Sequence, residues 1–232
     1  MNENKICLLK KEKNLARDKI LSRNLILKNA KREFLEKGFE KASMRTIAGQ
    51  SGLTVGAIYR HFTSKEELFE ALVEPTLKGA TDLFEYELDI ASDKLNEIYE
   101  LDGTYIESAD ANAGVLRMID YIYDNYDAFD LMFNCSQGTK YESIQEYFVE
   151  MDVKGTKIYM AEMEARGLIK NHLTETELHI FCTMVMTPVF EVINHKYDYE
   201  EAVEMVKLMS YGQYWAWDKI CRLDRREFFG QV

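Results

Sequence analysis

Apolar residues near the start of the chain recur at the spacing of an α-helix. Between about Ser22 and Lys37 they occupy one helical face, and charged or polar residues occupy the others. Glycine tolerates the positive φ that closes a helix, so Gly38 is expected to end this segment. The apolar face consists of Ile26, Ala30, Phe34 and Leu35. The pattern therefore predicts a first helix with one apolar face.

A short second helix is predicted directly after it. Ser43 can cap its start, because a serine hydroxyl accepts a hydrogen bond from the free N–H groups there. Ile47 and Ala48 are expected to face inward, and Gly52 is expected to end the segment. This helix has room for about two turns.

The stretch TVGAIYRHF predicts a third helix of barely two turns. Thr54 is its expected cap, and Ile58 and Phe62 are its only large apolar residues at i, i+4 spacing. These two are expected to pack inward, which leaves the other positions largely outward. Ser64 and Glu67 then form a capping box, S-x-x-E, for the helix that follows.

The pattern stays helical to the end of the chain. Only two prolines interrupt it, and Pro75 marks a point where the helix after Ser64 can kink or break. Leu, Glu, Lys, Met and Ala, which are good helix formers, are abundant. The sequence predicts an all-α fold. The further predicted helices cover residues 76–90, 93–107, 114–126, 127–135, 141–166, 174–195 and 199–223.

The last predicted helix is apolar over an unusually wide arc. One face carries Met205, Met209, Gly212 and Ala216, and a neighbouring face carries Val203, Val206, Tyr214 and Trp217. A helix of this kind must be covered from more than one side. The domain itself is one expected cover, and a second subunit is the other, which predicts a dimer interface at the first of these faces.

Charge divides the chain unevenly. Residues 1–65 hold 15 Lys and Arg against 6 Asp and Glu, a net charge of +9. The other 167 residues hold 14 against 34, a net charge of −20. Such asymmetry is typical of a small basic module that binds a polyanion, joined to an acidic module that does not. A basic tail with chance clustering is the simpler alternative.

Other classes of protein are not favoured. No apolar run predicts a membrane span, and no signal peptide is recognised. The four cysteines lie far apart without a CxxC pair, which favours a reducing cytoplasm. Glu175 with His179, and Glu191 with His195, have metal-ligand spacing but lack a third ligand, so neither a metal nor a cofactor is expected. No nucleophile–base pair or phosphate-binding glycine loop indicates an enzyme.

The two short helices, SMRTIAGQSGLTVGAIYRHF, match the helix-turn-helix pattern. In this arrangement the first helix braces the second, which projects into a major groove of DNA. Val55, Gly56 and Ala57 are small enough for the backbone to approach base edges. Arg45 is the expected reader of a guanine edge. Arg60 is either a DNA contact or a solvated surface arginine.

Phosphate contacts are expected around the same helix. The helix after Ser64 offers free backbone N–H groups and the ammonium of Lys65. Hydrogen-bonding side chains also flank the predicted groove. They are Thr54, Tyr59 and His61.

These residues resemble the TetR family of transcriptional regulators. The resemblance covers roughly residues 22–70, where a dozen positions agree with the family in type and order. Met44 departs from it, because the family usually has a phosphate-contacting hydroxyl there, so Met44 is expected to add only a backbone contact. Ser43 is also expected to contact DNA. The agreeing positions are Phe34, Gly38, Phe39, Ile47, Ala48, Gly52, Ile58, Tyr59, Phe62, Lys65, Glu67 and Leu68.

The resemblance implies a division into functional domains. Residues 1–17 would form a basic N-terminal arm, which is longer than the usual lead-in, 18–65 the DNA-binding domain, and 66–232 a helical effector-binding and dimerisation domain. It also implies a repressor that binds a palindromic double-stranded DNA operator as a homodimer and is released by a small-molecule effector. The family hollows its helical core into a ligand cavity. The large residues expected to line one here are Tyr121, Phe133, Tyr147, Tyr159, Met163, His179, Cys182, Met186 and Phe190.

Two other interpretations stay open at this point. One is an architectural DNA-binding protein without an effector, and the other is a helical enzyme with a basic surface. The large residues of the acidic part are also the ordinary content of a closed core. The basic arm is either unstructured or a contact to DNA.

Overall fold

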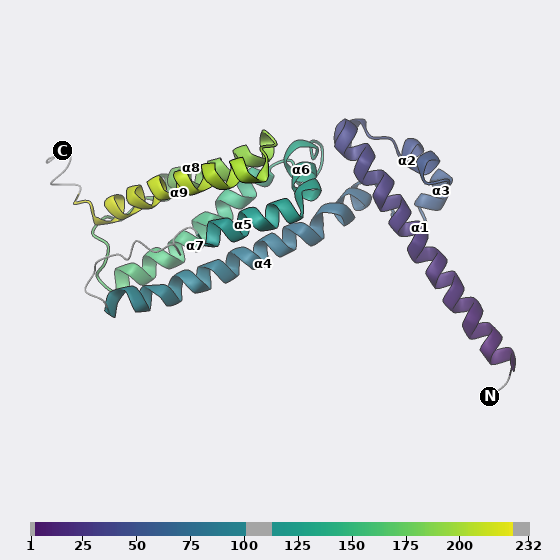
Figure 1. Ribbon diagram of the computed structural model, residues 1–232, viewed down its shortest axis with the longest axis horizontal. Helices are drawn as coiled ribbons and strands as arrows, with labels where there is room; N and C mark the ends of the chain where they lie inside the picture. Colours follow the sequence, from purple (N-terminus) through teal and green to yellow (C-terminus); the bar gives the residue numbers. More distant parts are fainter. Residues whose placement is uncertain (1–2, 101–112, 225–232) are drawn as a thin grey trace. The chain divides into compact units, whose positions relative to one another are not determined.

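The computed structural model describes residues 3–100 and 113–224, and within them it contains α-helices and turns but no strand (Figure 1). The side chains of residues 3–17 and 94–100 and of Tyr214 are outside this description. The predicted all-α fold is confirmed. The lysines of the basic arm, the end of the predicted helix 93–107 and Tyr214 therefore lie outside the described side chains.

The helix-turn-helix is built from α1 (Glu3–Lys41), α2 (Met44–Gln50) and α3 (Val55–Ile58). α1 begins much earlier than predicted, because the backbone of residues 3–17 continues the helix. Gly38 has a φ of 72°, so it interrupts α1 as predicted, and one last turn follows it. α3 has four residues, which is shorter than the two turns expected.

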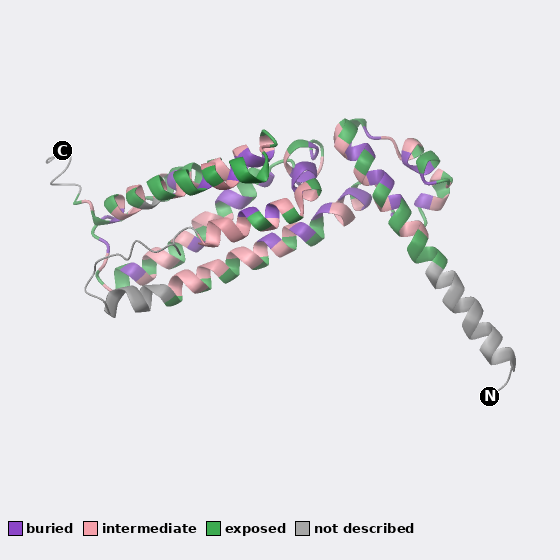
Figure 2. Cartoon of the chain, viewed as in Figure 1, coloured by how far each residue is buried: buried purple, intermediate pink, exposed green. Residues whose placement is uncertain are grey.

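The predicted inward positions of these helices are confirmed (Figure 2). The caps are confirmed as well, since the Ser43 hydroxyl accepts from Thr46 N and the Thr54 hydroxyl accepts from Ala57 N. Leu35 is only half-buried. The large side chains that are at most 1% exposed include Ile26, Phe34, Ile47, Ile58 and Phe62.

The break expected at Pro75 is wrong. α4 runs without interruption from Lys65 to Glu100 and contains Pro75, so three predicted helices are one. A proline inside a helix removes one hydrogen bond and costs about 3 kcal/mol. The burial of apolar side chains before and after Pro75 in α4 offsets this cost. Phe69, Val73 and Ala80 are all fully buried.

The remaining helices agree with the prediction to within a few residues. They are α5 (Ala113–Asp124), α6 (Tyr126–Asn134), α7 (Ile144–Ala165), α8 (Glu175–Asn194) and α9 (Tyr199–Arg222). α8 packs against α7 and α9, and α5 packs against α9. Gly155 lets α7 approach α4, because a Cβ at this position would lie 2.7 Å from Leu88 Cδ1.

The chain divides into two compact units. The first contains residues 1–76 and 127–142, and the second contains 77–126 and 143–232. α6 and the loop after it thus belong with the helix-turn-helix: Phe39 N donates to Cys135 O over 2.8 Å, and Tyr141 Oη donates to Glu74 over 2.5 Å. α4 contributes its first residues to one unit and the rest to the other. The predicted functional boundary near residue 65 stays a prediction.

α8 is also, among the described helices, the one whose length and composition would suffice to cross a membrane. The core helix of a water-soluble protein can satisfy the same criterion. α8 begins with Glu175 and Glu177 and lies between α7 and α9. We therefore treat it as a core helix of the second unit.

Candidate DNA interface and effector cleft

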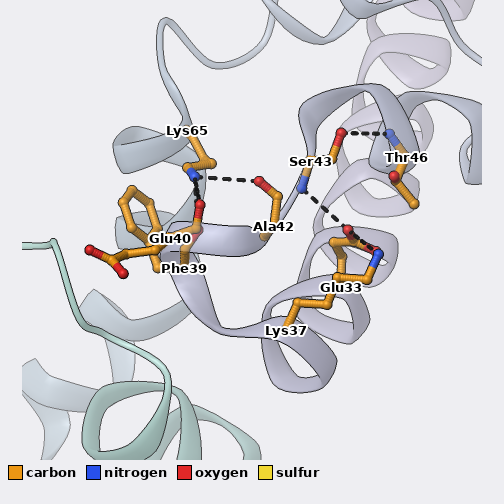
Figure 3. Close-up of polar contacts among 8 residues, drawn as sticks. All are labelled: Glu33, Lys37, Phe39, Glu40, Ala42, Ser43, Thr46 and Lys65. Carbon is orange, nitrogen blue, oxygen red and sulfur yellow. Dashed lines mark hydrogen bonds and ion pairs between the residues drawn. The ribbon is translucent and has the colours of Figure 1, made fainter.

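A buried carboxylate organises the connection between α1 and α2 (Figure 3). Glu33 is 1% exposed, and its Oε1 accepts from Lys37 Nζ over 2.8 Å and from Ser43 N over 3.2 Å. The Ser43 hydroxyl is used at the same time as the cap of α2. Ser43 therefore connects α1 to α2 through its backbone N–H and caps α2 with its hydroxyl. Its predicted contact with DNA stays a prediction.

Lys65 closes the end of α1. Its Nζ donates to Phe39 O over 2.8 Å and to Glu40 O over 3.2 Å, and it lies 4.3 Å from the centroid of the Phe39 ring (Figure 3). A third carbonyl, Ala42 O, is 3.4 Å away. Carbonyls at a helix end lack partners within the helix, so an ammonium stabilises them. The phosphate contact predicted for Lys65 stays a prediction, and the structure adds this capping role.

The capping box before α4 differs in one partner from the prediction. Glu67 N donates to Ser64 Oγ over 3.0 Å, as expected. The Glu67 carboxylate, however, reaches back to Thr63, whose backbone N lies 2.5 Å from Oε2. These bonds hold the turn between α3 and α4.

A second polar pair fixes the angle between α1 and α2. Asn29 is buried, and its Nδ2 donates to Ser51 Oγ over 3.0 Å at the end of α2 and to Leu25 O within α1. Both side chains are thereby satisfied, which is what burial of polar groups requires. These bonds tie the end of α2 to α1.

The outer side of α2 and α3 carries the predicted DNA contacts. Arg45, Thr54, Gly56, Tyr59 and Arg60 are exposed, and Tyr59 is 49% exposed although it is aromatic. Met44, Val55, Ala57 and Lys65 are half-buried. A Cβ added at Gly56 would meet no atom within 4 Å, so this position is open towards a partner. These residues are thus exposed or half-buried, and their DNA contacts stay a prediction.

Two further cations join this surface from α1. Lys19 and Arg23 both lower the pKa of His61, after burial, which is the main cause, and ahead of Arg60. Arg23 also lies 4.3 Å above the centroid of the Phe62 ring. His61 is half-buried, and its Nδ1 has no hydrogen-bond partner. The charges of Lys19, Arg23 and Arg60 all act on His61, so this part of the first unit is positively charged. Lys19 and Arg23 were not among the residues predicted from the sequence.

The second unit contains a cleft of about 270 Å³ among α4, α5, α7, α8 and α9. Most of the lining is aliphatic or aromatic, which is typical of a small-molecule site. The lining residues are Leu88, Ala91, Val115, Asp152, Thr156, Tyr159, Phe181, Val185, Ser210, Gln213 and Trp217.

Asp152 is the acidic residue of this cleft. Burial raises its pKa from 3.8 to about 6, and a hydrogen bond with Cys182 partly opposes the rise. Burial and the nearby Asp152 raise the pKa of Cys182 to about 12, so Cys182 stays a thiol. Sequence reasoning missed Asp152. The available signal was a carboxylate on the apolar stripe of α7, at helical spacing from Phe148 and Tyr159.

A second hollow, of about 380 Å³, lies further along α8 and α9. Ile180 and Met184 line it, and both are exposed side chains of α8. It therefore opens on the same surface as the apolar residues that α8 leaves uncovered. The cleft with Asp152 is the better candidate for a small molecule, because five helices contribute to its lining.

Of the nine residues predicted to line an effector pocket, Tyr159 lines the cleft with Asp152. Cys182 lies next to it, with Sγ 3.8 Å from Thr156 Oγ1. Met163 packs in a small cluster with Ile169 and Cys221. Phe133 belongs to the first compact unit. The other five, which stay a prediction, are the half-buried Tyr121, His179 and Met186, the exposed Tyr147 and the buried Phe190.

The residues predicted to form a dimer interface remain accessible. Met209 is 43% exposed, Gly212 is exposed with open space around it, and Met205 and Ala216 are half-buried. Larger exposed apolar side chains lie near them on α8 and α9. They are Ile180, Met184, Leu208, Tyr211 and Trp215.

Of the two pairs with metal-ligand spacing, Glu175 and His179 have other partners, whereas Glu191 and His195 contact each other. Glu175 accepts from Lys157 Nζ over 2.6 Å, and His195 Nε2 lies 2.9 Å from Glu191. His179 lies 4.0 Å from Glu146. Over residues 3–100 and 113–224, no group of three or more His, Cys, Asp or Glu side chains is placed to hold a metal ion.

The three short-range packed helices of the first unit define the class of domain: a helix-turn-helix. Residues 26–72 match the family model described as bacterial regulatory proteins of the TetR family. Residues 26–72 therefore carry a DNA-binding domain of the TetR type.

Similar proteins share mainly this N-terminal region. The repressor KstR2 of Mycobacterium tuberculosis is 34% identical over 90 residues, 38% of this chain and 43% of KstR2. The nucleoid occlusion factor SlmA of Mannheimia succiniciproducens is 29% identical over 84 residues, 36% of this chain and 39% of SlmA. The chain thus spans less than half the length of these curated relatives.

One solved structure extends the likeness to the whole fold. SmeT, the repressor of a Stenotrophomonas maltophilia multidrug efflux pump, was solved in complex with triclosan and is 19% identical. The match covers 84% of this chain and 91% of SmeT, with a TM-score of 0.54. At this identity the likeness supports the fold alone.

Proposed function

We propose that this protein is a cytoplasmic repressor that binds a palindromic operator as a homodimer and is released by a small-molecule effector. The exposed surface of α2 and α3 carries the proposal. It combines cations and an open glycine with a tightly packed support. A surface of this kind fits the major groove, and the phosphates beside it attract the cations.

The residues of this surface have different proposed roles. Arg45 reads a guanine edge, and Gly56 with its neighbours Val55 and Ala57 admits the bases closely. Tyr59 contacts a phosphate. Arg60 also contacts a phosphate, rather than being a solvated surface arginine. Lys19 and Arg23 extend the phosphate contacts along α1.

The homodimer is proposed on the apolar surface of α8 and α9. Leu208 is 66% exposed and Tyr211 is 55% exposed, and exposed apolar patches of this kind mark interaction sites. Two DNA-binding units can grip adjacent major grooves when their projecting helices lie about 34–36 Å apart. The operator would then be an inverted repeat with half-sites about 10 base pairs apart, centre to centre.

α4 is the proposed link between effector and DNA. Its first residue, Lys65, closes the end of α1, and its later residues Leu88 and Ala91 line the cleft. An effector that favours one placement of α4 over another shifts the equilibrium between DNA-binding and released forms. A coupling of about 1–3 kcal/mol would weaken operator binding roughly 5- to 150-fold.

The test begins with DNA. The purified protein is used to select fragments of its own genome, and the selected fragments are expected to share an inverted repeat. A ligand found by thermal-shift screening is then titrated with and without that operator. Linkage requires the ligand and the operator to weaken each other by the same factor. Equal ligand affinities in both titrations would refute control of DNA binding by the ligand.

An architectural DNA-binding protein without an effector is the second candidate. The similarity to SlmA, a nucleoid occlusion factor, supports this candidate. The cleft with its single acid favours an effector instead. Selection of many unrelated fragments, combined with no thermal shift by any ligand, is the result expected of the second candidate.

A further inference from the structure

The charge of Asp152 has no counter-charge in the cleft. No Lys, Arg or His lines the cleft, and within the described part of the chain no ion pair involves Asp152. Around it stand the aliphatic side chains of Leu88 and Val115 and the aromatic rings of Tyr159 and Phe181. An ionised carboxylate in apolar surroundings is costly unless a partner neutralises it.

The neighbours of Asp152 do not remove this cost. The Cys182 thiol is a weak donor and stays protonated, and Thr156 is neutral. The Gln213 amide is directed elsewhere, since its Nε2 donates to Met184 O over 3.0 Å and to Val185 O over 3.3 Å. With a pKa of about 6, Asp152 is mostly ionised at neutral pH in the unliganded cleft. The cleft therefore holds a negative charge that none of its described lining residues neutralises.

The aromatic rings of the cleft can contact both a cation and the apolar part of a ligand. Phe181 and Trp217 lie with their ring centroids 4.9 Å apart, inclined by 41°. Ring faces attract cations, and ring edges pack against apolar groups. The acidic part of the chain, with its net charge of −20 over residues 66–232, also raises the local concentration of cations.

We propose that the cleft binds an amphipathic cation, an organic amine whose ammonium group pairs with Asp152 and whose apolar part lies against Phe181 and Trp217. The volume of about 270 Å³ lies near the lower end of ligand sites, which favours a small amine. This proposal names the chemical class of the proposed effector, and in that sense it rests on the proposed function.

The test compares three probes of the same size. Phenylbutylamine, phenylbutanol and phenylbutyrate differ only in a cationic, neutral or anionic head group. Their dissociation constants are measured by calorimetry on the full-length protein at neutral pH, without DNA. A hydrogen bond to a charged partner is expected to make the amine bind about tenfold more tightly than the alcohol. The butyrate is expected to bind most weakly.

Two variants assign this preference to a residue. Asp152→Asn keeps the shape of the side chain and removes its charge, so the amine should bind no more tightly than the alcohol. Glu150→Gln is the matched control, because Glu150 is an exposed acid of the same helix outside the cleft. It should leave the preference intact. Circular dichroism checks that both variants are folded.

Several results would overturn the proposal. They are equal binding of amine and alcohol, absence of amine binding at millimolar concentration, or an equal loss of preference in both variants. The ligand series on the unmodified protein decides the matter even if Asp152→Asn does not fold.

The operator titration separates this proposal from the proposed function. If the amine binds through Asp152 and operator affinity does not change, the ligand class stands and the regulatory role fails. If operator binding responds to a ligand that does not depend on Asp152, the regulatory role stands and the ligand class fails.

Discussion

The two compact units bury their apolar residues in different ways. In the first unit, Phe34, Ile58 and Phe69 are fully buried, and Phe34 and Phe69 meet edge to face at 5.2 Å. In the second unit, Ile180 is 62% exposed and Leu208 is 66% exposed, and a cleft remains among five helices. Figure 2 shows the contrast between the central part of α1 and the surface of α8 and α9.

This difference corresponds to two ways of binding a partner. The first unit has a closed core around α2 and α3, although Ile20 and Leu21 of α1 are exposed apolar side chains. The residues proposed to bind DNA are exposed polar groups and an open glycine outside that core. The second unit leaves apolar surface and a buried charge without a match, and such features are stabilised only when something else covers or neutralises them.

The largest effect is expected for the core of the first unit. Phe34→Ala removes a fully buried ring that also stacks on Phe39 at 5.9 Å, and it should lower the free energy of unfolding by about 3–5 kcal/mol. Urea denaturation followed by circular dichroism measures this. Tyr86→Ala, at a side chain that is 57% exposed in the second unit, should change it by less than about 0.5 kcal/mol. Equal effects would contradict the contrast between the units.

The second effect concerns the uncovered surface of α9. Gly212→Arg fits into open space within one subunit, so the melting temperature of the monomer should not fall. In a dimer it places a charge in an apolar interface, and the dimer dissociation constant should rise more than about tenfold. Sedimentation measures the state of assembly, and operator binding should weaken in parallel. If the unmodified protein is a monomer at micromolar concentration, the proposed interface is wrong.

A smaller effect separates folding from DNA binding in α3. Gly56→Ala adds a methyl group in open space, and alanine favours a helix, so stability should stay constant or rise by up to about 1 kcal/mol. Operator affinity should fall by about 1–3 kcal/mol if bases approach this position closely. Gly49→Ala in α2 is the matched control, because its surroundings are equally open. An equal loss of affinity in both variants would place the DNA elsewhere.

The smallest effect should depend on pH. Burial raises the pKa of Asp152 to about 6, so between about pH 4 and 6 the folded protein holds a proton that the unfolded chain releases. The stabilising contribution of protonated Asp152 is therefore complete below about pH 4 and is lost as the pH rises through 6. Cys182 lies beside Asp152, and its pKa of about 12 keeps it protonated over this range.

Asp152→Asn removes this titration. The free energy of unfolding should rise by about 1–2 kcal/mol at about pH 7.5, and the gain should shrink towards pH 4. Urea denaturation at a series of pH values gives the curve, with Glu150→Gln as the control. A gain that does not vary with pH would mean that the Asp152 carboxylate is not the cause.

Local patterns determined much of this protein. The caps at Ser43 and Thr54, the positive φ of Gly38 and the inward positions of α1 to α3 were all predictable from the sequence, because each depends on neighbours within a turn or two. The helix-turn-helix and its exposed contacts follow from the same spacing, and so did the resemblance to the TetR family.

Contacts distant in sequence were decided only by the tertiary structure. Lys65 closes the end of α1, α6 joins the first unit, and α4 continues through Pro75, because packing against other segments sets the balance of energies at each of these places. The cleft is the clearest case. In the sequence Asp152 is one of 40 Asp and Glu. The packing of five helices makes it the carboxylate among the described residues that line a mainly apolar cleft.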